Sequence, residues 1–105
     1  MPRNTKKERS NALYAAIMSL KDEEECRRFF DDLCTPTELR SMEQRFDVAV
    51  YLMQHLVYAD ILEKTGTSSA TISRVRRAIL DNDTGAMREV IAREGLAENT
   101  EENGR

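Results

Sequence analysis

The start of a long helix at residues 35–38, and the apolar seam that follows it, limit the fold of this chain more than any other feature. Thr35 is a favourable N-cap, Pro36 fits the first helical position, and Glu38 can bond back to the cap. Apolar residues then recur at spacings of three and four, at Leu39, Met42, Phe46, Ala49, Met53 and Leu56. The pattern predicts a helix of about 18 to 20 residues with one continuous apolar face.

This long helix is apolar beyond a single face, because Val48, Val50 and Leu52 lie off the seam. A helix of this kind has to be enclosed on several sides. It can be the central helix of a monomeric core or part of an interleaved dimer. Since a chain of 105 residues has limited surface to bury within itself, we favour an intertwined homodimer.

The rest of the chain has the same helical character. Apolar spacings predict two short helices that start near Ser10 and Asp22, and a last helix that ends near Gly95. We expect one all-α domain at residues 10–95, between a flexible basic arm at 1–9 and a disordered polar tail at 96–105.

The composition and charge of the chain narrow the classes of function. No run approaches the roughly 20 apolar residues of a membrane span, and the N-terminus has no signal-peptide pattern, so we expect a cytoplasmic protein that does not contact membranes. The net charge of -3 argues against nucleic acid only if charge is evenly spread. Residues 1–9 carry +3 and residues 55–80 carry +2, whereas residues 10–54 and 81–105 each carry -4. Binding to phosphate groups therefore stays open.

Residues 57–79 predict two short helices around a tight turn. Ile61 and Leu62 mark the inner side of the first helix, and Gly66 tolerates the positive φ that a sharp turn requires. The second helix begins at a serine cap, and its inner stripe consists of Ile72, Val75 and Ile79. This arrangement is typical of a helix-turn-helix.

The outer face of the second helix suits the major groove of DNA. Small polar residues at its start allow close approach to base edges, and arginines can contact guanine or phosphate. We expect base contacts from Ser68, Ser69, Ala70 and Ser73, with Tyr58, Arg74 and Arg77 at the groove edge, and phosphate contacts from Lys64, Thr67 and Arg76. The alternative is an αα-hairpin in a helical protein-protein adaptor, whose serines only cap and whose arginines only solubilise.

The stretch from Phe29 to Leu80 resembles the tryptophan-repressor superfamily. The segments FFDDLCTP at 29–36 and GTSSATISRV at 66–75 resemble its YerC/YecD-type branch closely. The resemblance implies a bacterial, all-helical, intertwined homodimer whose two helix-turn-helix units meet double-stranded DNA in successive major grooves. It therefore implies a sequence-specific, DNA-binding regulator of transcription.

The sequence departs from the tryptophan-binding members of that superfamily at one informative position. In those members two arginines sandwich the indole, and a following glycine leaves room for it. Arg45 and Arg74 stand at the matching positions here, but Val75 replaces the glycine. A branched side chain fills that space, so we expect that tryptophan is not the corepressor. A pocket at Arg45, Arg74 and Val75 for a different small ligand stays open.

Little in the sequence supports catalysis. His55 is the one histidine and has no cysteine or carboxylate at metal-ligand spacing, so we expect neither a metal nor a cofactor. We interpret His55 as a residue at the C-terminal end of the long helix. There is no glycine-rich phosphate loop and no nucleophile elbow, and we expect that the protein is not an enzyme.

Overall fold

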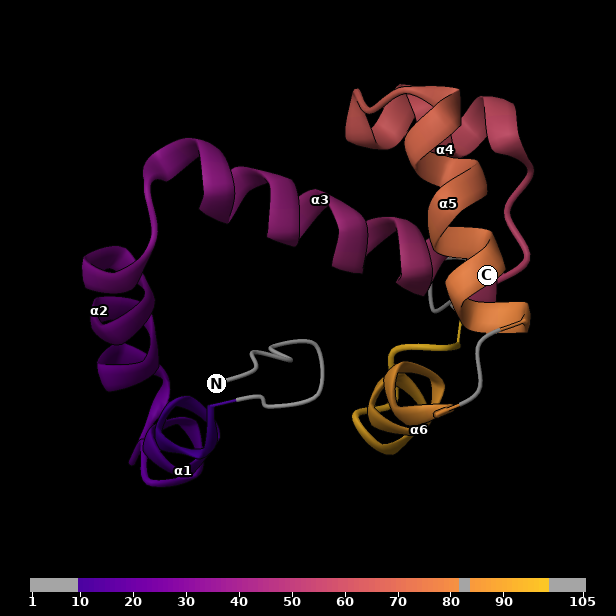
Figure 1. The fold of residues 1–105 in the computed structure, drawn as a ribbon. Coiled ribbons are helices and arrows are strands. Elements are labelled where there is room, and N and C mark those ends of the chain that lie inside the picture. The colour runs from indigo at the N-terminus through magenta and orange to yellow at the C-terminus, as the bar shows by residue number, and fades with distance from the viewer. Residues whose placement is uncertain (1–9, 82–83, 99–105) are drawn as a thin grey trace, which may run out of the picture. The chain divides into compact units, whose positions relative to one another are not determined.

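A computed structural model describes residues 10–81 and 84–98, so the predicted basic arm and residues 99–105 of the predicted tail lie outside the described residues. All regular secondary structure in this part of the chain is helical, which confirms the all-α prediction (Figure 1). The helices are α1 (Asn11–Met18), α2 (Glu23–Leu33), α3 (Pro36–Met53), α4 (Tyr58–Thr65), α5 (Ser69–Leu80) and α6 (Ala86–Arg93).

The first three helices begin at side-chain caps. The Asp22 carboxylate accepts a hydrogen bond from Glu25 N at 2.9 Å. Thr35 Oγ1 accepts from Glu38 N at 3.1 Å, and Thr35 N donates to Glu38 Oε1 at 2.8 Å, which completes a capping box. The predicted start of the long helix is confirmed, and its 18 residues match the expected length.

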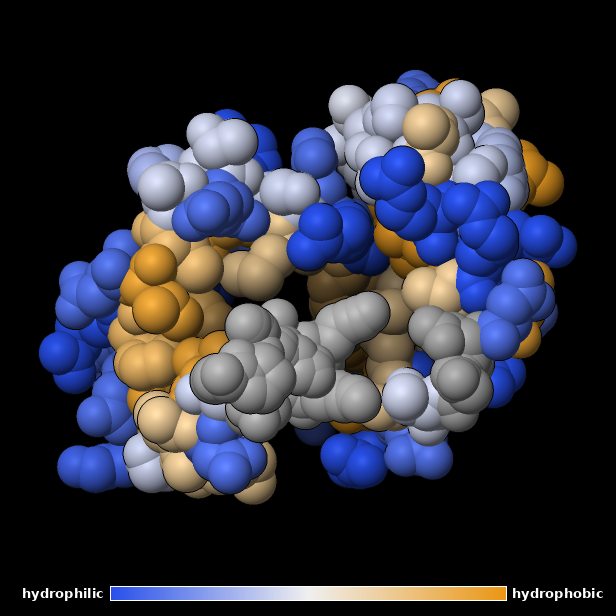
Figure 2. All heavy atoms as spheres, viewed as in Figure 1, coloured by the Kyte–Doolittle hydropathy of each residue, from blue (hydrophilic) through white to orange (hydrophobic). Residues whose placement is uncertain are grey.

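The chain divides within α3 into two compact units, Met1–Leu39 and Arg40–Arg105. In the first unit, α2 has an apolar stripe that includes Phe29 and Phe30, whose rings meet edge to face with centroids 5.2 Å apart. None of the described residues 10–39 is buried, and Met18 and Leu33 are 83% and 53% exposed. Figure 2 shows apolar side chains on the surface of this unit, over α2.

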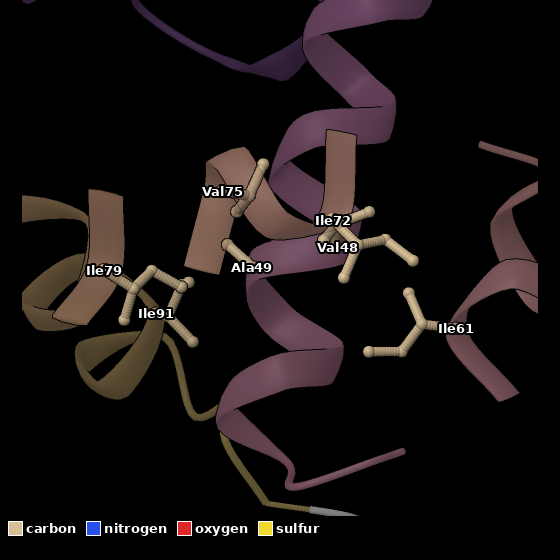
Figure 3. Packing of buried hydrophobic residues seen from close by; sticks show 7 residues of the cluster. All are labelled: Val48, Ala49, Ile61, Ile72, Val75, Ile79 and Ile91. Atoms are coloured by element: carbon tan, nitrogen blue, oxygen red, sulfur yellow. The ribbon is translucent and has the colours of Figure 1, made fainter. Parts of the chain in front are cut away.

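The second unit contains a core to which four helices contribute. Its buried residues are Val48 and Ala49 on α3, Ile61 on α4, Ile72, Val75 and Ile79 on α5, and Ile91 on α6. Figure 3 shows Ile61 pointing toward Val48 and Ile72. The predicted inner stripe of the second short helix is confirmed, because all three of its members are buried.

The C-terminal end of α3 differs from the predicted seam. The seam continues to Leu56, but the helix ends at Met53, and His55 has a φ of +66°. His55 N donates to Leu52 O at 2.9 Å and Leu56 N donates to Tyr51 O at 3.1 Å, the pair of bonds that defines a Schellman motif. His55 therefore lies beyond the last helical turn, in the left-handed position that glycine usually takes.

The C-terminal segment after α6 is tied to the end of α3. Gly95, with a φ of +73°, and Leu96 end α6 with the same pair of hydrogen bonds. Gln54 Nε2 then donates to Leu96 O at 3.0 Å and to Glu98 O at 3.4 Å. Among the helices of residues 10–81 and 84–98, none combines the length and apolar character that crossing a bilayer requires.

Candidate functional site

The candidate site is formed by α4, α5 and the short connection between them. Gly66 caps α4 in the left-handed conformation, with a φ of +70°, and Gly66 N donates to Leu62 O at 2.9 Å. Ser68 is the N-cap of α5, and its Oγ accepts from Thr71 N at 3.1 Å. The two helices together span residues 58–80, compared with the predicted range of 57–79.

Helix α5 has two different faces. Ile72, Val75 and Ile79 are at most 6% exposed and face the core. Arg74, Arg76 and Arg77 are exposed, and α5 contains no acidic residue. Strongly hydrophilic side chains gather over α5 in Figure 2. The burial of one stripe therefore leaves a basic face in solvent.

The N-terminal turn of α5 is also open to solvent. Ser68, Ser69 and Ala70 are exposed, and Ser73, one turn further, is half-buried. The Ser68 hydroxyl is used locally, because it donates to Thr71 Oγ1 at 3.1 Å as well as accepting the capping bond. A helix N-terminus carries a partial positive charge that attracts anions. At the start of α5 this charge coincides with small polar residues.

The remaining predicted contact residues surround α5. Tyr58 lies at the start of α4 and is exposed, and Thr67 is half-buried in the turn. Lys64, at the end of α4, is exposed and holds its ammonium 5.9 Å from the centroid of the Tyr51 ring. Tyr51 belongs to α3 and was not predicted as part of the site. A cation–π contact between residues 13 positions apart has no local sequence signal.

The residues of the predicted ligand pocket have contrasting environments. Arg45 on α3 and Arg74 on α5 are exposed, whereas Val75 is 4% exposed and belongs to the core cluster. A hollow of about 410 Å³ is lined by other residues of α3, α5 and α6, with Arg76 and Arg88 among them. Within residues 10–81 and 84–98, no three His, Cys, Asp or Glu side chains gather as a metal site requires.

One carboxylate of α3 has altered acidity. Partial burial, and next to it the negative charge of Glu43, raise the pKa of Asp47 above its ordinary value of 3.8. Glu43 lies one helical turn before Asp47, so both carboxylates share one side of α3. Asp47 is therefore a pH-sensitive position of the second unit.

The regular structure of the described residues is helical, with two short helices on either side of a glycine turn and a basic face on the second of them. The sequence model of the family described as Trp repressor protein matches residues 8–94 of this chain. The chain belongs to the Trp repressor family, which confirms the resemblance found in its residues. This is a family of regulators and not a family of enzymes.

Individual relatives agree with this assignment. YerC of Bacillus subtilis strain 168 is 54% identical over 67 residues, which are 64% of either protein, so the chain spans just under two thirds of that relative. A TrpR-like protein from Eubacterium eligens shares 48% identity and a TM-score of 0.79, with 84% of this chain and 90% of that one covered. A candidate Trp repressor from Staphylococcus aureus shares 39% identity and a TM-score of 0.82, with 93% of this chain and 100% of that one covered.

Proposed function

We propose that the protein is a sequence-specific, DNA-binding regulator of transcription that acts as a homodimer. In this proposal α4, the turn at Gly66 and α5 form a helix-turn-helix, and α5 enters the major groove. The observation that carries the proposal is the division of α5: its three branched apolar residues are buried, whereas Ser69 and the three arginines are exposed and Ser73 is half-buried. Membership of the Trp repressor family supports the same function.

The proposed contacts follow the exposure of each side chain. Ser69, Ala70 and Ser73 contact base edges, because they occupy the first two turns of a helix whose other side is buried, and Arg74 and Arg77 lie at the groove edge. Ser68 contributes through the hydroxyl lone pair that capping leaves free, and Tyr58 lies at the groove edge. Phosphates are held by Lys64 and Thr67, which lie near the start of the helix, and by Arg76, about two turns along it.

The homodimer is supported by the apolar surface of the first unit. Residues 10–39 form two helices with apolar stripes, and no described residue there is buried. Amphipathic helices are stabilised mainly by packing of the apolar face, so a second copy is the partner that this proposal assigns to them. Two copies also present two helix-turn-helix units, as recognition of a two-fold symmetric site requires.

Tryptophan is not the effector in this proposal. Val75 belongs to the core cluster with Ile72 and Ile79, and we infer that a branched side chain at this position takes the space that an indole ring would need. Isothermal titration with tryptophan is expected to give no heat with the wild-type protein. Binding of indole to the wild type would show that the steric argument is wrong.

The function is tested by selecting bound fragments from a random DNA pool and measuring their affinity by fluorescence anisotropy at several salt concentrations. Wild-type affinity should fall steeply with salt, since each neutralised phosphate releases counterions. Arg74→Ala with Arg77→Ala should weaken binding by several kcal/mol per dimer, at roughly 1–3 kcal/mol for each lost contact. The control is Arg88→Ala with Arg93→Ala, which removes the same charge from α6.

The control variant is expected to bind nearly as tightly as the wild type. Equal losses in both double variants would show that only net charge matters, and would reject the assignment of α5. A helical adaptor with an apolar interface would select no DNA fragment, and its affinity for its protein partner would hardly respond to salt.

A further inference from the structure

Helix α4 is attached to one face of α3 by an apolar contact and by two polar residues. Gln44, Val48 and Tyr51 follow one another on α3 at spacings of four and three residues, so they lie on one face of the helix. Val48 is completely buried, as is Ile61 of α4, and the two belong to one core cluster in which Ile61 points toward α3 (Figure 3). An apolar contact therefore lies at the centre of this attachment, with a polar residue of α3 on either side of it.

Both polar residues reach the C-terminal end of α4. Gln44 Nε2 donates to Thr65 O at 3.1 Å, in a partly buried hydrogen bond between residues 21 positions apart. Tyr51 provides the ring beneath the Lys64 ammonium. The last carbonyl groups of a helix have no partner within the helix, and Gln44 supplies one for Thr65. Apolar packing alone permits sliding and rotation, whereas a directional hydrogen bond selects one orientation.

Thr65, which accepts the hydrogen bond from Gln44, makes further hydrogen bonds near the start of α5. Thr65 Oγ1 donates to Ile61 O at 2.7 Å and accepts from Thr67 N at 3.2 Å. Thr67 directly precedes Ser68, the N-cap of α5. Hydrogen bonds made by the backbone and the side chain of Thr65 thus connect α3 with Thr67, the residue before the N-cap of α5.

We propose that Gln44 is a positioning residue that sets the orientation in which α5 is presented to DNA. The inference rests on the proposed function, and it assigns to Gln44 a role without any contact to DNA. Holding the helix in its binding orientation before DNA arrives lowers the conformational cost of association. Loss of the bond should therefore weaken DNA binding while the protein stays folded.

The test replaces the amide group of Gln44 by a side chain of similar length that cannot donate. In Gln44→Met the donor is lost without a change in charge, and in Gln44→Glu a carboxylate faces the Thr65 carbonyl. Both variants should bind a selected DNA fragment about tenfold more weakly at a temperature at which circular dichroism shows them folded. The slope of affinity against salt should stay that of the wild type, because the same phosphates are neutralised once the complex forms.

Gln54 provides a matched control on the same helix. Its amide also donates to backbone carbonyls, those of Leu96 and Glu98, which follow α6 and lie outside the candidate interface. Gln54→Met should lose a bond of the same chemistry and keep wild-type affinity for DNA. Equal weakening by Gln44→Met and Gln54→Met would overturn the proposal, because it would indicate a general effect on stability.

Amide hydrogen exchange tests the positioning without DNA. The amides of Thr67 and Thr71 should exchange faster in Gln44→Met than in the wild type, and at the wild-type rate in Gln54→Met. If the wild type selects no DNA fragment, the proposed function fails, and the exchange rates still decide whether Gln44 holds the start of α5. Wild-type affinity together with wild-type exchange in Gln44→Met would overturn the proposal.

Discussion

The two units of the chain form helices by the same local signals and differ completely in burial. In residues 10–39, α1 and α2 begin at the side-chain caps Ser10 and Asp22, and no described residue is buried. Among the described residues 40–81 and 84–98, four helices enclose seven buried apolar residues. Capping and periodicity therefore indicate where helices begin and end, whereas a core needs several helices to converge. Under the proposed function, a second copy supplies that convergence for the first unit.

The largest expected effect comes from placing charge on the uncovered apolar surface of the first unit. Met18 and Leu33 are the final residues of α1 and α2, where lysine also interacts favourably with the helix dipole. Met18→Lys with Leu33→Lys should therefore keep the helices and disrupt the homodimer. Burial of each such side chain contributes roughly 1.5–3 kcal/mol, so dissociation should become about 100-fold easier or more. Light scattering coupled to size exclusion measures the change.

The control for this variant places lysines on the polar sides of the same helices, as Ala15→Lys with Asp32→Lys. Both positions are exposed, and this variant should remain dimeric. A wild-type protein that is monomeric at micromolar concentration, or a Met18→Lys, Leu33→Lys variant that stays dimeric, would contradict the second-copy explanation.

The next effect, in order of size, tests the core of the second unit. Ile61→Ala removes a completely buried side chain where α3, α4 and α5 meet, and should lower the free energy of unfolding by about 2–5 kcal/mol. Val57→Ala, four residues earlier at a position that is 62% exposed, should change it by less than about 0.5 kcal/mol. Urea unfolding measures both values. Similar losses in the two variants would remove the contrast between buried and exposed apolar residues.

Local patterns predict more of this structure than of its long-range contacts. The capping box at Thr35, the turn at Gly66 and the stripe of α5 depend on residues within four positions of one another, and all three were predicted. Burial along α3 was predicted only in part: Ala49 on the seam and Val48 off it are both buried, whereas Met42 and Phe46 on the seam are partly exposed. Which side of α3 is covered depends on where α4, α5 and α6 pack, and no spacing within α3 contains that information.

The candidate site also combines features that local sequence patterns predict with long-range contacts that they do not. The exposed serines and arginines of α5 follow from helical periodicity once the apolar stripe is known. The bond from Gln44 to Thr65 and the ring of Tyr51 beneath Lys64 could not be predicted, since each joins α3 to a distant part of the chain. His55 was placed correctly near the helix end, but no residue pattern indicated its positive φ.

A smaller effect is expected at the two Schellman ends of the second unit. His55 and Gly95 adopt nearly the same φ, +66° and +73°, although only Gly95 lacks a Cβ atom. The left-handed conformation costs residues with a Cβ roughly 1–2 kcal/mol, partly offset by the greater freedom of glycine in the unfolded chain. His55→Gly should therefore stabilise the protein by about 0.5–1 kcal/mol, and Gly95→Ala should destabilise it by about 1 kcal/mol. Thermal unfolding of both variants measures the difference, and a destabilising His55→Gly would indicate that the imidazole makes a stabilising contact.

The smallest expected effect concerns the pKa of Asp47, an ionisable residue of the second unit that is partly buried. Partial burial, followed by the charge of Glu43, raises the pKa of Asp47 above 3.8, so the folded state favours the protonated carboxyl. The stability contributed by the protonated form is complete below the unfolded pKa and is lost as the pH rises through the folded pKa. Asp47→Asn should therefore stabilise the protein at pH 7 and have no such effect at pH 3, with a small gain because the residue is largely exposed and screened. Glu43→Gln should give a smaller gain in stability, since it removes the lesser of the two causes. Urea unfolding at both pH values measures these changes, and a destabilising Asp47→Asn at pH 7 would contradict the argument.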